Sequence, residues 1–278
     1  MKHSSKKYSN SKSQPYHKSS RAQAEPRKKK EHGQVFLRDQ SIVEDMLADA
    51  QVQPNHTVVE IGCGDGFLTS SLLCYTPCKK LVVFEIDEEW ARVVKEKCTS
   101  PKLDLNIVNF LDVDLTQFFS AEDPVVLLAN LPYHITFPIF HVLKKNSALF
   151  SHGVVMVQEE VAQRLVATHG RSAGAISHYF QHFFELKLLT KVPPTAFDPQ
   201  PQIFSRLVSF RPKKNSAPIP DEEHFWEFVK TCFRNPRQML HNNLKSTPFA
   251  HIKLSPEMSN LRAQQMNMEL FLQLWESR

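Results

Sequence analysis

Four consecutive residues, Asn130-Leu131-Pro132-Tyr133, combine the groups needed to methylate an amine on a planar base. The exocyclic amine of adenine is a weak nucleophile because its lone pair is delocalised into the ring. Two acceptors aimed at its N–H bonds, the Asn130 side-chain oxygen and the Leu131 carbonyl, restore its reactivity and stabilise the developing positive charge. Pro132 fixes the direction of that carbonyl, and Tyr133 offers a ring on which the base can stack. The motif predicts N6-methylation of adenine, driven mainly by positioning.

A cluster of glycines indicates where the methyl donor binds. Gly62, Gly64 and Gly66 lie within five residues, directly after a predicted strand, in a chain that has only seven glycines. Such a segment can turn sharply and approach a ligand closely. A dinucleotide fingerprint would need glycine where the chain has Phe67, and the lysine of a phosphate-binding loop is missing. The spacing favours S-adenosyl-L-methionine, with Gly62 and Gly64 among its contacts.

Two acidic residues are predicted to join the glycines at one edge of a sheet. Glu85 ends the second predicted strand, about twenty residues beyond the glycines, where a carboxylate can accept hydrogen bonds from both ribose hydroxyls. Asp112 ends the third predicted strand, where it could accept from the adenine amine of the cofactor. The carboxyl ends of parallel strands meet at one crevice, so these groups are expected to converge.

The elements that must position these residues alternate between strands and helices. Apolar, β-branched runs predict five strands, at residues 57–61, 80–87, 105–112, 124–130 and 153–157. Helices are predicted at 88–98, 159–168 and 173–184, and strands at 184–192 and 206–210 form an antiparallel pair at the end of the sheet. The predicted fold is α/β, a Rossmann-like class I S-adenosylmethionine-dependent methyltransferase sheet followed by a small all-helical domain.

Composition divides the chain into three parts. Residues 1–32 hold ten Lys/Arg and two Glu, so this segment has a net charge of +8. The whole chain has a net charge of +5, so the remaining residues together carry −3. It is predicted to be a basic disordered tail that either binds RNA or only aids solubility. Residues 33–212 are predicted to form the catalytic domain. Residues 213–278, which follow a proline-rich break and show only helical periodicity, are predicted to form a small all-helical domain.

Several classes of protein are excluded by composition. No apolar run is long enough to cross a membrane, and the basic N-terminus has no apolar segment behind it. The five cysteines form no CxxC pair and the histidines no HExxH motif, so neither disulfides nor a metal site are expected. A cytoplasmic, monomeric enzyme without a metal is therefore expected.

The motifs resemble those of the KsgA (RsmA) and Erm family of ribosomal RNA adenine N6-methyltransferases, over about residues 33–278. The matching segments are GQVFL at 33–37, EIGCGDGFLT at 60–69, FEID at 84–87, NLPYHI at 130–135, QEEVAQRL at 158–165 and VPPTAFDPQP at 192–201. FRNPRQMLHNNL at 233–244 and RAQQMNMELFLQL at 262–274 resemble the KsgA branch. That branch implies two adjacent adenines near the 3′ end of 16S rRNA, each dimethylated at N6 in the immature small ribosomal subunit during its biogenesis. It also implies that the helical domain at residues 213–278 binds rRNA.

The resemblance also implies roles for single residues. The positions that match cofactor contacts in the family are Leu37, Gly62, Glu85, Asp112 and Asn130. Phe197 matches an aromatic residue that sandwiches a flipped target base together with Tyr133.

Two segments depart from the family pattern. Val35 stands where the family has an asparagine, so any cofactor contact there is limited to the backbone or to apolar contact. Gln202 and Phe204 replace the usual lysine and aspartate after the proline loop, which leaves the RNA contacts of that loop open.

Two alternatives remain at this point. An Erm-type 23S rRNA adenine N6-methyltransferase is one, because a basic N-terminal tail occurs in that branch too. A non-catalytic factor for small-subunit assembly is the other, because the change at Val35 could weaken cofactor binding.

Overall fold

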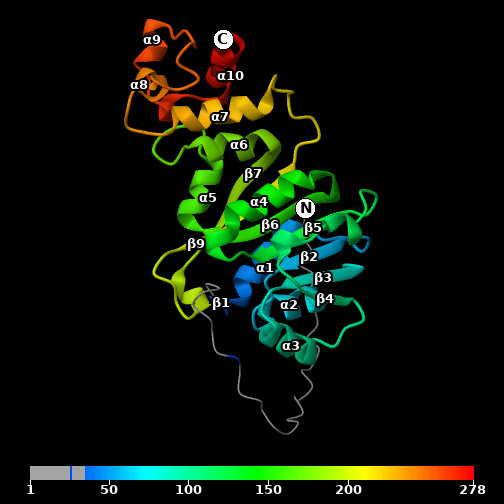
Figure 1. Ribbon diagram of the computed structural model, residues 1–278. Helices are drawn as coiled ribbons and strands as arrows, with labels where there is room; N and C mark the ends of the chain where they lie inside the picture. Colours follow the sequence, from blue (N-terminus) through cyan, green and yellow to red (C-terminus); the bar gives the residue numbers. More distant parts are fainter. Residues whose placement is uncertain (1–25, 27–34) are drawn as a thin grey trace, which may run out of the picture.

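The computed structural model describes Pro26 and residues 35–278 (Figure 1). Apart from Pro26, the predicted tail, together with Gly33 and Gln34, lies outside the described residues. The strands are β1 (Phe36–Leu37), β2 (Thr57–Ile61), β3 (Lys80–Glu85), β4 (Leu103–Ile107), β5 (Val125–Asn130), β6 (Phe150–Gln158), β7 (Phe184–Val192), β8 (Phe197–Asp198) and β9 (Ser205–Pro212). The helices are α1 (Gln40–Ala50), α2 (Phe67–Tyr75), α3 (Glu88–Lys97), α4 (Thr136–Lys145), α5 (Glu159–Val166), α6 (Ala175–Phe183), α7 (Glu222–Cys232), α8 (Leu240–Leu244), α9 (Pro256–Ser259) and α10 (Met268–Glu276).

Seven strands form one sheet in the order β4-β3-β2-β5-β6-β9-β7. The first five are parallel, and β9 and β7 add to the edge in antiparallel fashion. A separate antiparallel bridge joins β1 to β8 and pairs Leu37 with Phe197. The sequence order reverses between β2 and β5, and the carboxyl ends of parallel strands at such a point form a crevice.

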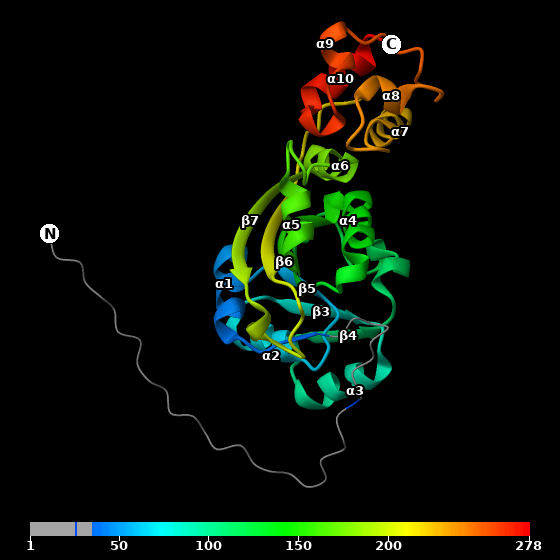
Figure 2. The same cartoon turned by 90° about the vertical axis from the view of Figure 1, so that its left-hand side faces the viewer.

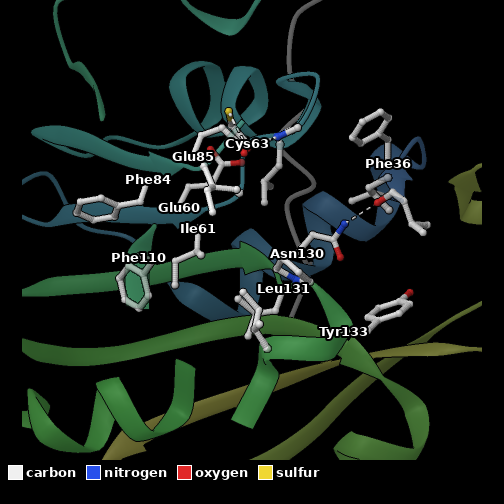
Figure 3. A pocket seen from close by; sticks show the side chains of 18 of the residues that line it. Phe36, Glu60, Ile61, Cys63, Phe84, Glu85, Phe110, Asn130, Leu131 and Tyr133 are labelled. Atoms are coloured by element: carbon white, nitrogen blue, oxygen red, sulfur yellow. Dashed lines mark hydrogen bonds between the residues drawn. The ribbon is translucent and has the colours of Figure 1, made fainter. Parts of the chain in front are cut away.

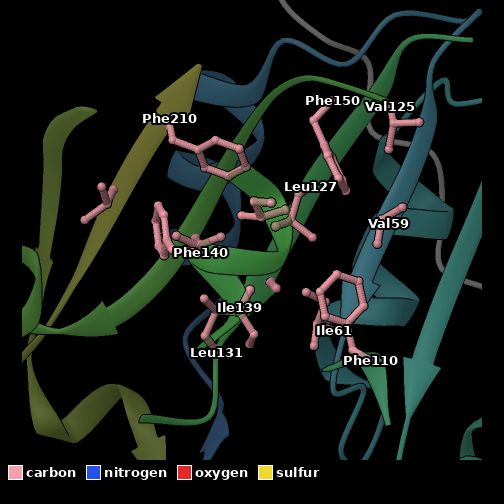
Figure 4. Close-up of a cluster of buried hydrophobic side chains, with 14 of the residues drawn as sticks. Val59, Ile61, Phe110, Val125, Leu127, Leu131, Ile139, Phe140, Phe150 and Phe210 are labelled. Atoms are coloured by element: carbon pink, nitrogen blue, oxygen red, sulfur yellow. The ribbon is translucent and has the colours of Figure 1, made fainter. Parts of the chain in front are cut away.

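Both faces of the sheet are buried, which explains why its strands are almost continuously apolar. Along β2, Val59 and Ile61 contact the core under α4, α5 and α6, whereas Val58 contacts the core under α1, α2 and α3. Figure 2 shows helices on both sides of the sheet, and Figure 4 shows Phe140 of α4 among the sheet residues of the first core. Burial on both faces fixes where each strand ends, and so positions the residues that follow it.

The C-terminal helices α7 to α10 enclose a third apolar core of their own. Phe225, Phe228 and Trp275 are buried in it, and the indole nitrogen of Trp275 donates to the Pro220 carbonyl over 2.7 Å. Tyr179 of α6 contacts this core edge-on through Trp226, so α6 joins the two parts (Figure 1). The boundary predicted after residue 212 coincides with the last residue of β9.

The predicted α/β fold with an antiparallel strand pair and a helical C-terminal part is confirmed. One strand was predicted wrongly: β4 ends at Ile107, and residues 110–112 form a 3-10 turn instead of continuing to Asp112. The bridge between β1 and β8 was not predicted, because strands of two residues have no periodicity. In the described part of the chain, no helix has the length and apolar character needed to cross a membrane.

Gly153 of β6 offers a test of the packing between β5 and β9. A Cβ atom at this position would lie 2.5 Å from the Phe210 ring and 2.6 Å from the Leu127 carbonyl oxygen. Because neither group can move easily inside a buried sheet, Gly153→Ala is expected to lower the free energy of unfolding by about 1–3 kcal/mol. Denaturant unfolding measures this change. Gly174→Ala is the control, since nothing lies within 4 Å of its added Cβ, and an equal loss in both variants would contradict the packing argument.

Candidate active site

A cavity of about 280 Å³ opens at the carboxyl ends of β2, β3 and β5. It is lined by the segment around β1, the glycine loop after β2, the end of β3, the loop after β4 and the motif after β5 (Figure 3). Val35, Leu37, Gly62, Gly64 and Glu85 all line it, as the sequence predicted. All four residues from Asn130 to Tyr133 line it too.

The side chain of Asn130 has a defined orientation. Its Nδ2 donates to the backbone carbonyl of Val35 over 3.1 Å. A carbonyl can only accept, so the amide must direct its NH₂ group toward Val35 and its oxygen the other way. No described residue donates to that oxygen, and in Figure 3 it points away from the dashed hydrogen bond of Asn130. The predicted acceptor is therefore available inside the cavity.

The backbone after Asn130 leaves a second acceptor free. The Leu131 amide donates to Met156 over 3.0 Å, and the Pro132 carbonyl accepts from Ile135 in the 3-10 turn Tyr133–Ile135. The Tyr133 carbonyl accepts from Thr136. No residue in the described part of the chain donates to the Leu131 carbonyl oxygen. The two acceptors predicted from the sequence, the Asn130 oxygen and the Leu131 carbonyl, thus have no hydrogen-bond partner among the described residues.

The ring of Tyr133 is held at the cavity through its hydroxyl. That hydroxyl lies 2.7 Å from the Oγ of Ser205, the first residue of β9. Ser205 is fully buried, and burial raises the pKa of Tyr133, so the phenol stays protonated. Anchoring the hydroxyl fixes the ring plane and leaves the ring as a flat apolar surface for a base.

The glycine loop has a shape that side chains would prevent. Gly62 and Gly64 both have positive φ angles, of 75° and 51°. A Cβ atom on Gly64 would lie 2.7 Å from the ring of Phe36, so β1 can cover the loop only because this residue is glycine. Phe36 in turn contacts Trp90 edge-on, with ring centroids 4.9 Å apart. The glycine loop and β1 therefore form one wall of the cavity.

Glu85 is buried at the end of β3, with its carboxylate bound to backbone amides. Its Oε2 accepts from the Gly64 amide over 3.1 Å, and its Oε1 accepts from the Asp87 amide over 2.8 Å. The Cys63 thiol lies 3.5 Å from the same Oε2. Burial and the nearby acids raise the pKa of Cys63, so this thiol is not a nucleophile.

Glu60 is a cavity residue that the sequence reasoning missed. It is fully buried, and burial raises its pKa to about 8, although a 2.7 Å hydrogen bond from Thr69 to Oε2 opposes that rise. Oε1 has no hydrogen-bond partner within the described residues. Glu60 lies within β2, just before the glycine loop. An acid inside an otherwise apolar strand was the sequence signal that could have identified Glu60 as a cavity residue.

The prediction for Asp112 is wrong. Asp112 is exposed, does not line the cavity and accepts from Asn109 Nδ2 over 2.8 Å. Because β4 ends early, it is Asn109 that lies against the cavity, and its Oδ1 caps the turn by accepting from the Leu111 amide over 3.2 Å. Asn109 therefore takes the place expected for Asp112.

The structure does not bring Phe197 to the cavity. Only 3% of Phe197 is exposed, and it does not line the cavity. The pairing of β8 with β1 sets it opposite Leu37, and it packs in the core that also contains Val192 and Leu207. The structure places Tyr133, and not Phe197, at the cavity.

Comparison with known proteins identifies the family. The family model for ribosomal RNA adenine dimethylase matches residues 25–276. The chain belongs to the ribosomal RNA adenine dimethylase family. It is 34% identical to the ribosomal RNA small subunit methyltransferase A of Chlorobium phaeobacteroides, over 89% of this chain and 90% of that one. It is 36% identical to the protein of that name from Mycoplasma mobile, over 78% and 83%.

Solved structures confirm the fold. A dimethyladenosine transferase from Plasmodium falciparum superposes with a TM-score of 0.72 at 23% identity, covering 86% of this chain and 95% of the other. The 23S rRNA methyltransferase ErmE superposes with a TM-score of 0.67 at 21% identity, covering 87% and 98%. At such identities the likeness establishes the class I methyltransferase architecture and does not choose between the two substrates.

S-adenosylmethionine is the methyl donor of this family, and the cavity fits it. A Cβ on Gly62 would meet only the Pro132 ring, at 3.9 Å, and both residues line the cavity, so glycine leaves room there. Glu85 stands at the strand end where ribose hydroxyls are bound. The unpaired Oε1 of Glu60 is an acceptor for an ammonium group such as that of the methionine moiety. Each of these features suits a different part of one ligand.

The ionisation of Glu60 should appear in the pH dependence of stability. Its pKa rises from 4.5 to about 8 on folding, so the folded protein keeps a proton that the unfolded chain loses. The stability from this group is full below pH 4.5 and is lost as the pH rises to about 8. Glu60→Gln cannot ionise and should not show this loss. The difference in unfolding free energy between Glu60→Gln and the wild type should therefore grow in favour of the variant by up to about 1.4 kcal/mol per pH unit between pH 4.5 and about 8.

Denaturant unfolding of the cofactor-free protein at several pH values measures that difference. Glu257→Gln, at an exposed acid of α9, is the control and should follow the wild-type curve at every pH. Parallel curves for wild type and Glu60→Gln would show that Glu60 is charged in the folded protein.

Proposed function

We propose that this protein dimethylates N6 of two adjacent adenines near the 3′ end of 16S rRNA in the immature small ribosomal subunit, using S-adenosylmethionine. The observation that carries the proposal is the pair of unpartnered acceptors at Asn130 and Leu131, which face a cavity with a glycine loop. The relatives at 34–37% identity are named for the small subunit, which supports this choice of RNA.

The residues of the chain bind and orient the reacting amine. The Asn130 oxygen and the Leu131 carbonyl accept the two N–H groups of adenine, which draws the nitrogen lone pair out of the ring. The Tyr133 ring stacks on the base and keeps it out of the nucleic-acid stack. S-adenosylmethionine, when bound, supplies a methyl group on a sulfonium, which is a good leaving group, so no strong base is needed during the transfer.

The same two acceptors serve both transfers to one adenine. After the first transfer the amine keeps one N–H, which either acceptor can hold while the lone pair again points to the donor. The surplus proton leaves to water after each transfer, since no described titratable side chain bonds to either acceptor. Dimethylation therefore requires positioning by acceptors rather than a general base.

The structure gives two reasons to prefer this function over its alternatives. A non-catalytic assembly factor was suggested by Val35, but the Val35 contact to Asn130 runs through the backbone carbonyl and survives the change of side chain. An Erm-type activity on 23S rRNA is supported by the basic N-terminal segment and by a fold likeness at 21% identity, whereas the relatives at 34–37% identity are named for the small subunit. We infer further that the protein acts in the cytoplasm as a monomer and needs no metal, and that its C-terminal helices contact rRNA.

Methyl transfer to isolated ribosomal subunits tests the substrate. Small subunits and large subunits from cells that lack this protein are incubated with methyl-labelled S-adenosylmethionine and the purified chain. Label is expected in small-subunit rRNA alone. Primer extension should then stop at two adjacent adenines, because N6-dimethyladenine does not pair. Label confined to large-subunit rRNA would establish the Erm-type activity instead, and absence of label would favour the assembly factor.

Removal of the Asn130 oxygen tests the chemistry. Asn130→Ala is expected to lower the single-turnover rate of methyl transfer by about 10²–10³-fold, as loss of one acceptor at a reaction centre does in other enzymes. Asn106→Ala is the matched control, because its side chain bonds only to Asp104 and does not line the cavity. A rate for Asn130→Ala close to that of the control would rule out the proposed role.

A further inference from the structure

Two large apolar side chains are exposed beside the active site, at the start of β9. Ile203 is 43% exposed and Phe204 is 45% exposed, in a chain whose other phenylalanines are mostly buried. They directly precede Ser205, whose hydroxyl holds Tyr133 at the cavity. The segment therefore lies one residue from a group that positions the target base, yet the chemistry described above does not use it.

Strand alternation places Phe204 on the opposite side of β9 from Ser205. Arg206, two residues further on, shares the face of Phe204 and pairs in register with Lys191 of β7. The Lys191 ammonium lies over the Phe204 ring, 4.4 Å from its centroid. Lys191 forms no ion pair with the described acids, although its charge helps to lower the pKa of Glu159. An aromatic ring and a cation thus stand together on the face of β9 opposite Ser205.

The backbone under this ring is fixed. The Phe204 carbonyl accepts from the Glu159 amide over 3.0 Å. Arg206 binds the Glu159 carboxylate with Nε at 2.7 Å and Nη2 at 3.1 Å. Burial raises the pKa of Glu159, but the bonds from Arg206 and Gln163 and the charges of Arg206 and Lys191 outweigh it and hold the pKa below its ordinary value. The Glu159 carboxylate is therefore bound directly by Arg206, and the Lys191 ammonium, which does not bond to it, stays available to a phosphate.

A ring beside a cation is the pattern with which proteins bind unpaired nucleotides, the ring stacking on a base and the cation on a phosphate. An adenine withdrawn from its stack leaves its neighbours in the strand with an unpaired face. We propose that Phe204 and Lys191 bind the nucleotide next to the target adenine, with its base stacked on the Phe204 ring and its phosphate on the Lys191 ammonium. This inference rests on the proposed function.

Methyl-transfer kinetics on small subunits that lack the modification test the proposal. Phe204→Ala is expected to lower kcat/KM by about tenfold through KM, the size of effect that loss of one stacked base produces. Phe204→Leu should lose as much, because it keeps apolar bulk but no ring, whereas Phe204→Trp should retain the wild-type value. Lys191→Gln should reduce the slope of log KM against log salt by about 0.7–0.9.

Ile203→Ala is the matched control, since Ile203 has the same exposure and no ring, and it should change kcat/KM by less than about twofold. Calorimetric affinity for S-adenosylmethionine should be the same in all variants, which shows that they are folded. The inference would be overturned if Phe204→Leu kept the wild-type kinetics, or if Phe204→Ala and Ile203→Ala lost the same amount of kcat/KM. It would also be overturned if sedimentation showed that the wild type is a dimer and that Phe204→Ala dissociates it, because Phe204 would then bind a second copy of the chain. If the wild type itself transfers no methyl to small subunits, the proposed function fails first and this inference falls with it.

Discussion

The hydrogen bond from Asn130 to the Val35 carbonyl determines what the active site can do. An amide side chain has one donating and one accepting end, and a carbonyl partner commits the donating end. The oxygen is thereby turned into the cavity without any acid or base to hold it. The bond requires Val35 to be in place, and that in turn requires β1 to pair with β8 and Phe36 to lie against Gly64. Reactivity at β5 thus depends on a segment almost a hundred residues earlier in the chain.

The same dependence explains why the change at Val35 leaves the orientation of Asn130 intact. A side-chain contact at this position would be lost with the asparagine of the family, but a backbone carbonyl is present whatever the side chain. Val35 also lines the cavity, so its isopropyl group adds apolar surface where the family has an amide. The structure separates two roles that the sequence could not distinguish, orientation of Asn130 by the backbone and contact with the ligand by the side chain.

Residues that follow long, doubly buried strands could be predicted, and residues placed by short non-local pairings could not. Glu85 and Asn130 end strands whose apolar runs are unambiguous, so their convergence followed from the parallel sheet. Asp112 was misplaced because the apolar residues Val108, Phe110 and Leu111 resemble a continuing strand, whereas Asn109 caps a turn and ends it. Phe197 was misplaced because its side of the backbone is set by the register with Leu37, a pairing of two residues with no local signal.

The electrostatics of the cavity argue for a cationic ligand independently of the family. Glu60 and Glu85 are both buried, and Glu85 is one of the groups that raise the pKa of Glu60. Glu85 is satisfied by backbone amides, which leaves the unpaired oxygen of Glu60 as the group that empty protein cannot satisfy. A positive group beside Glu60 would favour its ionised form and supply the missing hydrogen bond at once. S-adenosylmethionine carries an ammonium as well as a sulfonium, so its binding would give a partner to a buried oxygen that the described residues leave unpaired, which a neutral nucleoside without an ammonium would not do.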